Sequence, residues 1–142
     1  MLSLVMSVDD DSMVQMLSEI ILSDHQFCRN ILKIQDGKMA LDYFEGQKKL
    51  SKEDRILPEL LLLDINMPVM DGWDFLDLYQ KEYSDMLQNM KIVLLTSGID
   101  PDEEQKATIH PLVFKYITKP LEPRHIAELK NHPAFAENFS IS

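Results

Sequence analysis

The 142-residue sequence predicts an α/β fold in which helices cover both faces of a doubly wound, five-stranded parallel sheet. Short apolar runs alternate along the chain with longer segments of helical periodicity, which is the pattern of βα units. The run at 60–63 is apolar without interruption, as expected for a strand in the buried centre of a parallel sheet. The chain length fits a single domain.

The first strand is predicted at 2–8, and three aspartates follow it directly. Asp11 or Ser12 can cap the helix that comes next, because both side chains accept hydrogen bonds from free backbone N–H groups. Apolar residues recur at helical spacing along this helix. They are Met13, Leu17, Ile20 and Ile21.

The remaining elements keep the alternation. Further strands are predicted at 27–34, 59–63, 91–95 and 113–117. Further helices are predicted at 37–49, at 73–84, from Pro101 to a point before Pro111, and at 123–130. Pro101 suits a first helical position, and Asp100 before it can cap. The segment 131–142 has no clear period, so it is predicted to be a tail without an output domain, beyond a domain at 1–130.

The composition excludes several classes of partner. Lys and Arg total 14 against 24 Asp and Glu, a formal charge of −10, which argues against binding to nucleic acid or to an anionic membrane surface. Cys28 is the only cysteine, and the four histidines lack zinc spacing. No apolar run is long enough to span a membrane, and the N-terminus does not resemble a signal peptide. The chain is therefore expected to be soluble and cytoplasmic.

Polar residues follow four of the predicted strands, and the carboxyl ends of strands are where open α/β sheets carry their functional groups. Asp9 and Asp10 follow the first strand, Asp64 the third, Thr96 the fourth and Lys119 the fifth. Three carboxylates at one edge repel each other unless a cation lies among them, and oxygen ligands alone suit Mg²⁺. With a lysine and a hydroxyl nearby, the sequence predicts phosphoryl chemistry in which Asp64 is the nucleophile.

Four motifs, taken together, resemble the receiver domain of two-component response regulators, in the stand-alone form of the chemotaxis regulator, over about residues 2–130. The motifs are Val8-Asp9-Asp10, Leu63-Asp64-Ile65-Asn66-Met67-Pro68-Val69-Met70-Asp71-Gly72, Leu95-Thr96-Ser97 and Tyr116-Ile117-Thr118-Lys119-Pro120. Each motif is generic alone, but their order and separations are specific. The resemblance implies a flavodoxin-like sheet with strand order 2-1-3-4-5.

The resemblance also implies a role for each residue at the strand ends. Asp64 is the implied phosphoacceptor, and Thr96 and Lys119 would bind the phosphoryl oxygens. The implied ligands of Mg²⁺ are Asp9, Asp10, Asp64 and the backbone carbonyl of Asn66. Tyr116 occupies the position of the switch aromatic, which turns inward when Thr96 moves toward the phosphate. The peptide before Pro120 is expected to be cis, an isomer found in only about 5–6% of X–Pro bonds.

The implied phosphoryl donor is the phosphohistidine of a sensor kinase or of a histidine phosphotransfer protein. By the resemblance, this donor docks on the apolar face that Met13, Val14 and Met16 give the first helix; burial of these residues in the core is the alternative. The implied output face comprises the helix from Pro101, the strand at 113–117 and the helix at 123–130, and it serves a downstream protein effector, a homodimer, or both. His110, His125 and His132 lack partners at ligand spacing and are predicted to be surface residues.

Two other functions fit part of the pattern. A haloacid-dehalogenase-type phosphatase also forms an aspartyl phosphate, but it needs a second Asp two residues after the nucleophile, where this sequence has Asn66. A degenerate receiver would act only as a binding module, although the acceptor set here is intact. Gly98 stands where the family commonly has a larger residue, so the phosphoryl group is expected to be short-lived, lasting minutes and not hours.

Overall fold

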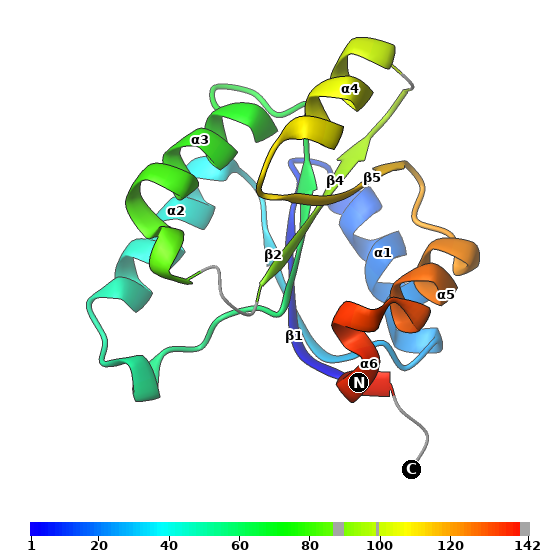
Figure 1. Ribbon diagram of the computed structural model, residues 1–142, viewed down its shortest axis with the longest axis horizontal. Coiled ribbons are helices and arrows are strands. Elements are labelled where there is room, and N and C mark those ends of the chain that lie inside the picture. Colours follow the sequence, from blue (N-terminus) through cyan, green and yellow to red (C-terminus); the bar gives the residue numbers. More distant parts are fainter. Residues whose placement is uncertain (87–89, 99, 140–142) are drawn as a thin grey trace.

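The structure is a computed structural model that describes residues 1–86, 90–98 and 100–139. Its centre is one parallel five-stranded sheet in the order β2-β1-β3-β4-β5, as predicted (Figure 1). The strands are β1 (Leu2–Val8), β2 (Cys28–Ile34), β3 (Leu60–Asp64), β4 (Lys91–Thr96) and β5 (Val113–Thr118). The predicted strands therefore agree with the observed ones to within one residue at either end.

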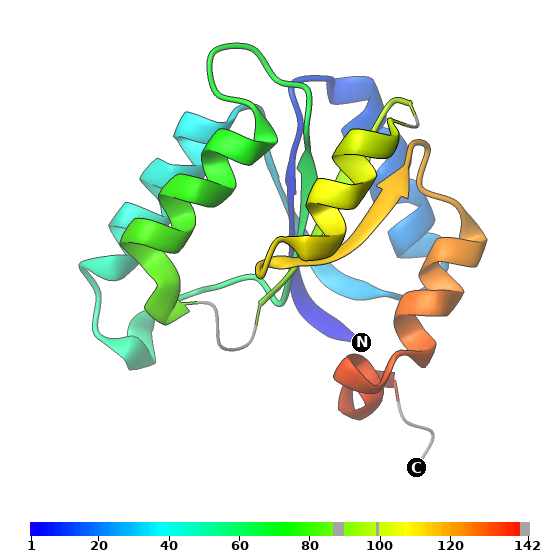
Figure 2. The ribbon, with the colours of Figure 1, turned by 45° about the horizontal axis from the view of Figure 1, so that its top comes forward.

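Helices cover both faces of this sheet. They are α1 (Ser12–Asp24), α2 (Gly37–Lys48), α3 (Gly72–Tyr83), α4 (Pro101–Ile109), α5 (Pro123–Asn131) and α6 (Ala136–Phe139). Helices α1 and α5 lie on one face, and α2, α3 and α4 lie on the other (Figure 2). No helix in the described part of the chain is long and apolar enough to cross a membrane.

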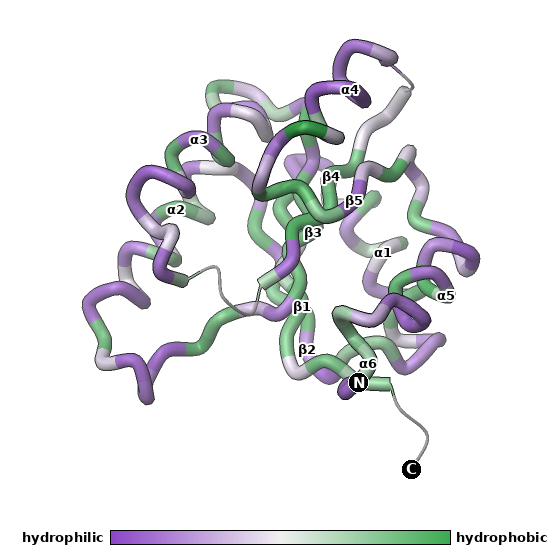
Figure 3. Tube along the Cα trace, in the orientation of Figure 1, coloured by the Kyte–Doolittle hydropathy of each residue, from purple (hydrophilic) through white to green (hydrophobic). Residues whose placement is uncertain are grey.

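The core consists of two apolar layers that are separated by the sheet. The layer under α2 and α3 includes Phe44, Phe75 and Tyr79, and the layer under α5 includes Ile126 and Leu129. All five residues of β3 are buried. Hydrophobic residues are concentrated along β1, β3 and β4, whereas most of α4 is hydrophilic (Figure 3). The two-sided burial of the sheet explains why the central strands are apolar on both faces.

The register of the sheet brings the carboxyl ends of four strands to one edge. Val8 of β1 pairs with Leu63 of β3, and Asp64 pairs with Leu95 of β4. Thr96 at the end of β4 pairs with Thr118 of β5. The residues that follow these positions therefore leave the sheet side by side.

The face of α1 that packs against the sheet is not the face that carries most of its apolar residues. Its buried residues are Gln15, Ser18 and Leu22. Several large apolar side chains are exposed instead: Met13 (58%), Met16 (44%), Leu17 (50%) and Ile20 (49%). Core burial of Met13 and Met16 is thus excluded, and the helix presents an apolar face to solvent.

His125 is buried, which contradicts its assignment to the surface; its exposed fraction is 5%. Its Nδ1 accepts a hydrogen bond of 2.9 Å from the backbone N–H of Glu122, the N-cap of α5, in a capping box. The His125 ring therefore accepts the hydrogen bond that a Glu or Gln side chain usually accepts at the third position of a capping box. His110 and His132, in contrast, are partly exposed.

The segment after α5 contains regular structure, so the predicted count of five helices is one short. A 3-10 turn at Pro133–Phe135 leads into α6. Phe135 is buried, and the Phe139 ring centroid lies 5.1 Å from that of Phe27. The Met1 ammonium group donates to the Asn138 carbonyl at 2.7 Å. These contacts join the N-terminus and residues 133–139 to the domain, and they are tertiary contacts that the local sequence pattern does not reveal; residues 140–142 of the predicted tail lie outside the described part of the chain.

The loop between β3 and α3 passes close to the end of β3. The Gly72 N–H donates to the Ile65 carbonyl at 2.8 Å, and Val69 adopts a positive φ of 69° within the loop. A Cβ atom at Gly72 would lie 2.9 Å from the Asp64 carbonyl oxygen and 2.9 Å from Ile65 Cα. Both neighbours are backbone atoms, so a side chain at this position must displace the chain beside Asp64.

We expect Gly72→Ala to lower the free energy of unfolding by about 1–3 kcal/mol, because the added methyl group overpacks rigid backbone. Gly46→Ala is the matched control, since it lies on the exposed side of α2 with nothing within 4 Å of the new Cβ. That change should raise stability by about 0.5–1 kcal/mol. Urea denaturation measures both values. Equal effects of the two substitutions would contradict the close approach at Gly72.

The buried His125 should make stability depend on pH. Burial, together with the nearby Arg124, lowers the pKa of His125 below its usual value of about 6.5. The unfolded chain therefore binds this proton more readily, and the contribution of the neutral ring to stability is lost as the pH falls below about 6.5. We expect His125→Gln, which keeps an acceptor for Glu122, to lose less stability than the wild type on acidification. Parallel stability curves for the two proteins would contradict this.

Candidate functional site

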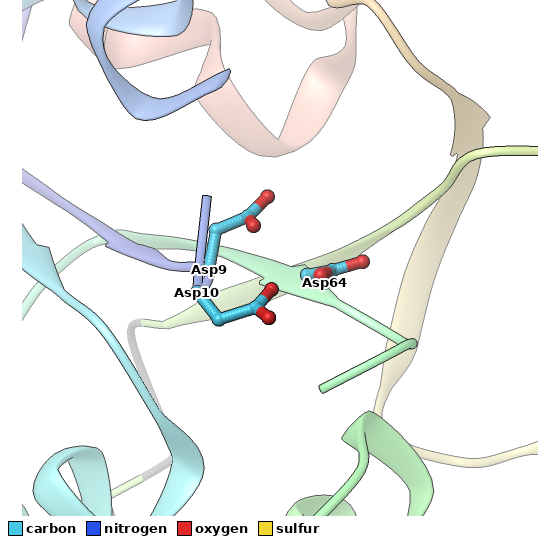
Figure 4. Close-up of side chains that lie close together, drawn as sticks. All are labelled: Asp9, Asp10 and Asp64. Atoms are coloured by element: carbon cyan, nitrogen blue, oxygen red, sulfur yellow. The ribbon is translucent and has the colours of Figure 1, made fainter. Parts of the chain in front are cut away.

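Three carboxylates converge at the carboxyl edge of the sheet. Asp9 and Asp10 directly follow β1, and Asp64 ends β3, so neighbouring strands supply the group (Figure 4). One oxygen of each residue lies within 4.8 Å of the others. Asp9 and Asp64 are buried, whereas Asp10 is exposed. The sequence predicted this convergence from the strand ends.

Lys119 bridges the two buried acids. Its Nζ lies 2.8 Å from Asp9 Oδ2 and 3.1 Å from Asp64 Oδ1. Its backbone N–H donates to the Thr96 carbonyl at 2.7 Å, which holds the residue at the end of β5 beside β4. The Lys119–Pro120 peptide is cis, as the resemblance implied. Although burial favours the neutral amine, contacts with Asp9 and Asp64 raise the pKa of Lys119 above its usual value.

Backbone N–H groups orient the same two carboxylates. Asp9 Oδ1 accepts a hydrogen bond of 2.9 Å from Asp11 N–H, and Asp64 Oδ1 accepts one of 3.2 Å from Asn66 N–H. Each donor lies two residues after its acceptor, so the turn that ends each strand also holds its carboxylate. The backbone at Asn66 therefore runs beside the Asp64 side chain.

The charges around Asp64 are not balanced. Burial and the neighbouring Asp9 raise the pKa of Asp64 to about 6, against the lowering effects of Lys119 and the Asn66 N–H group. One lysine thus offsets only part of the repulsion among three carboxylates. A further cation at this edge would favour the ionised form of Asp64.

The donor set fits a hard divalent cation. All three side chains offer carboxylate oxygens, and no His or Cys belongs to the cluster among the described residues. Asp9 Oδ2 is buried, and within the described part of the chain it accepts no hydrogen bond apart from its ion contact with Lys119. Exposed Asp10 leaves one side of the cluster open to solvent, which suits Mg²⁺ because this ion usually keeps several waters.

Thr96 and Tyr116, the two predicted switch residues, lie on the neighbouring strands β4 and β5, and the Thr96 side chain is close enough to influence the pKa of the Tyr116 hydroxyl. Thr96 is buried at the end of β4, and its Oγ1 donates to the Gly98 carbonyl at 3.0 Å. Tyr116 is half-buried on β5, and its hydroxyl donates to a carboxylate oxygen of Glu103 on α4 at 3.4 Å. Burial is the main cause of the raised pKa of Tyr116.

Two residues near the site were not identified from the sequence. Glu103 joins α4 to Tyr116, but it is one of three consecutive acidic residues in the first turn of α4, and the sequence does not distinguish it from the other two. Gln15 of α1 contacts the ends of β1 and β2. The spacing of Gln15, Ser18 and Leu22 marks them as one helix face, yet the apolar residues elsewhere on α1 conceal that this face is the buried one.

Comparison with known proteins agrees with this geometry. The response regulator receiver domain family model matches residues 5–130. Hybrid signal transduction histidine kinase I of Dictyostelium discoideum is 28% identical over 127 residues, which make up 89% of this chain and 7% of that protein. The response regulator protein VraR of Staphylococcus saprophyticus is 32% identical over 124 residues, 87% of this chain and 53% of VraR. The chain thus spans about half or less of these two relatives.

A solved structure extends the comparison to three dimensions. The two-component response regulator from Cytophaga hutchinsonii superimposes with a TM-score of 0.83 at 27% identity, covering 92% of this chain and 95% of that one. The five-stranded parallel sheet described above is thus shared with a response regulator of known structure. The chain is a member of the response regulator receiver domain family.

Proposed function

We propose that this chain accepts a phosphoryl group on Asp64 from a phosphohistidine of a sensor kinase or phosphotransfer protein, in the cytoplasm. The observation that carries the proposal is the geometry around Asp64. Its carboxylate lies 3.1 Å from the Lys119 ammonium group and within the acidic cluster with Asp9 and Asp10. A nucleophile, a cation-binding group and a fixed positive charge are thus together at one edge.

In the proposed reaction, an ionised oxygen of Asp64 attacks phosphorus as the P–N bond to the donor imidazole breaks. The bonding electron pair returns to the imidazole nitrogen, and an acyl phosphate forms on Asp64. Lys119 is placed to pair with the phosphoryl oxygens, and Thr96 supplies a hydroxyl to them. Mg²⁺ held by Asp9, Asp10, Asp64 and the Asn66 carbonyl would offset the charge of the transferring group.

Two surfaces are proposed for partners. The exposed apolar face of α1, with Met13, Met16 and Leu17, is the docking face for the kinase or phosphotransfer protein. The surface of α4, β5 and α5 is the output face, for a protein effector or a homodimer. Tyr116 connects the site to that surface, because its strand β5 lies beside Thr96 and its hydroxyl contacts α4.

The alternatives fit less well. A haloacid-dehalogenase-type phosphatase needs an acid two residues after the nucleophile, and Asn66 there cannot transfer a proton in that way. A degenerate receiver would not need Lys119 paired with two buried acids. We therefore propose a signalling module that catalyses only its own phosphorylation and dephosphorylation.

Incubation with Mg²⁺ and a small-molecule phosphodonor should add a single phosphoryl group, detected by intact-protein mass spectrometry. Asp64→Asn removes the nucleophile and should abolish the adduct. Asp71→Asn is the matched control, because Asp71 caps α3 and Asn caps equally well. An adduct that persists in Asp64→Asn would disprove the acceptor assignment. Continuous release of phosphate would indicate a phosphatase, and failure of the wild type to form an adduct would indicate a degenerate receiver.

The phosphoryl group should last minutes in Mg²⁺ buffer, because water can approach past Gly98. Gly98 is exposed, and a Cβ at this position would have nothing within 4 Å. A larger side chain can therefore be accommodated and should shield the acyl phosphate. We expect Gly98→Leu to slow the decay several-fold and Gly46→Ala to leave it unchanged, as measured by loss of the adduct over time. A lifetime of hours in the wild type, or faster decay in Gly98→Leu, would refute this.

A further inference from the structure

The face of α1 that packs against the sheet buries a polar side chain, Gln15, although the helix contains many apolar residues. Gln15 is buried, while four large apolar residues on the same helix are exposed. Burial of an amide costs free energy unless its hydrogen bonds are satisfied. An apolar side chain would not have that cost, so the hydrogen bonds of Gln15 account for its burial.

Gln15 spans the ends of two neighbouring strands. Its Nε2 donates to the Ser7 carbonyl of β1 at 3.0 Å and to the Ile34 carbonyl of β2 at 2.8 Å. Backbone carbonyls only accept hydrogen bonds, so both contacts require the amide nitrogen, and both of its protons are used. A side chain of α1 thus links the penultimate residue of β1 to the last residue of β2.

The same carbonyl of Ile34 also holds the backbone of Asp9. Asp9 N–H donates to it at 3.0 Å, so Gln15 and Asp9 share one acceptor. Ser7, the other partner of Gln15, lies two residues before Asp9. The backbone of Gln15 is anchored as well, because its N–H donates to the Asp11 carbonyl at 3.1 Å. Gln15 therefore contacts the chain on either side of the acidic pair.

We propose that Gln15 is a positioning residue for the cation site: it fixes the backbone from which Asp9 and Asp10 reach toward Asp64. The proposal rests on the function proposed above. Metal ligands depend on the groups that orient them, and loss of such a group commonly weakens metal binding about 10–100-fold. Gln15 would orient Asp9 and Asp10 by holding the backbone at the end of β1, since it forms no hydrogen bond to either carboxylate among the described contacts.

Titration of the unphosphorylated protein with Mg²⁺ alone, by calorimetry, tests this directly. Gln15→Met keeps the length of the side chain but removes both donors, and we expect it to weaken Mg²⁺ binding at least about tenfold. Leu22→Val is the matched control, because it trims the same buried face of α1 farther along the helix from Asp9. Its Mg²⁺ affinity should equal that of the wild type. Circular dichroism checks folding, and Gly46→Ala supplies a stabilised background if Gln15→Met is unstable.

The outcomes separate this inference from the proposed function. Unchanged Mg²⁺ affinity in folded Gln15→Met would overturn the positioning role, while the proposed function would stand. Equal weakening in Gln15→Met and Leu22→Val would overturn it too, because the loss would then reflect general loosening of α1. A wild type that binds no Mg²⁺ and forms no adduct would refute the proposed function and the inference together.

Discussion

The ion contacts of Lys119 with Asp9 and Asp64 are the interaction on which the arrangement of the site depends. Two buried carboxylates on neighbouring strands would repel each other without a positive charge between them. Lys119 reaches them because the register aligns the ends of β4 and β5, and because its own N–H is bound to the Thr96 carbonyl. Packing of the central strands thus determines the electrostatics of the edge.

Lys119 offsets only part of the repulsion among the three carboxylates, and this leaves the site able to bind a further positive charge. A second lysine would neutralise the acids, but in the proposed function it would also occupy the space required for the cation and the phosphoryl group. With Lys119 alone, Asp64 has a raised pKa, and the open side at Asp10 remains accessible. A further cation at this edge would therefore lower the free energy of the ionised site, and in the function we propose it would also offset the charge of the phosphoryl group that approaches Asp64.

The sequence was sufficient for the parts of the fold that local pattern determines. The apolar run at 60–63 and the acids after 2–8 identified both the buried strand and the edge where the site lies. The orientation of α1 was not predictable, because the burial of Gln15 depends on carbonyl groups of β1 and β2 that only the folded sheet brings to the helix. The burial of His125 and the packing of Phe135 likewise depend on tertiary contacts.

The unusual orientation of α1 has one physical explanation that covers both of its faces. On the face that packs against the sheet, Gln15 donates hydrogen bonds to the Ser7 and Ile34 carbonyls. An apolar residue at this position could not donate them. Outward, Met13 and Met16 stay exposed, which costs hydrophobic free energy in the isolated domain but leaves apolar surface for a partner helix. Because one helix carries both faces, a partner that docks on α1 as we propose would be held at a set distance from Asp9 and Asp10. In the function we propose, the phosphohistidine of that partner would approach Asp64 from the side of the cluster that exposed Asp10 leaves open.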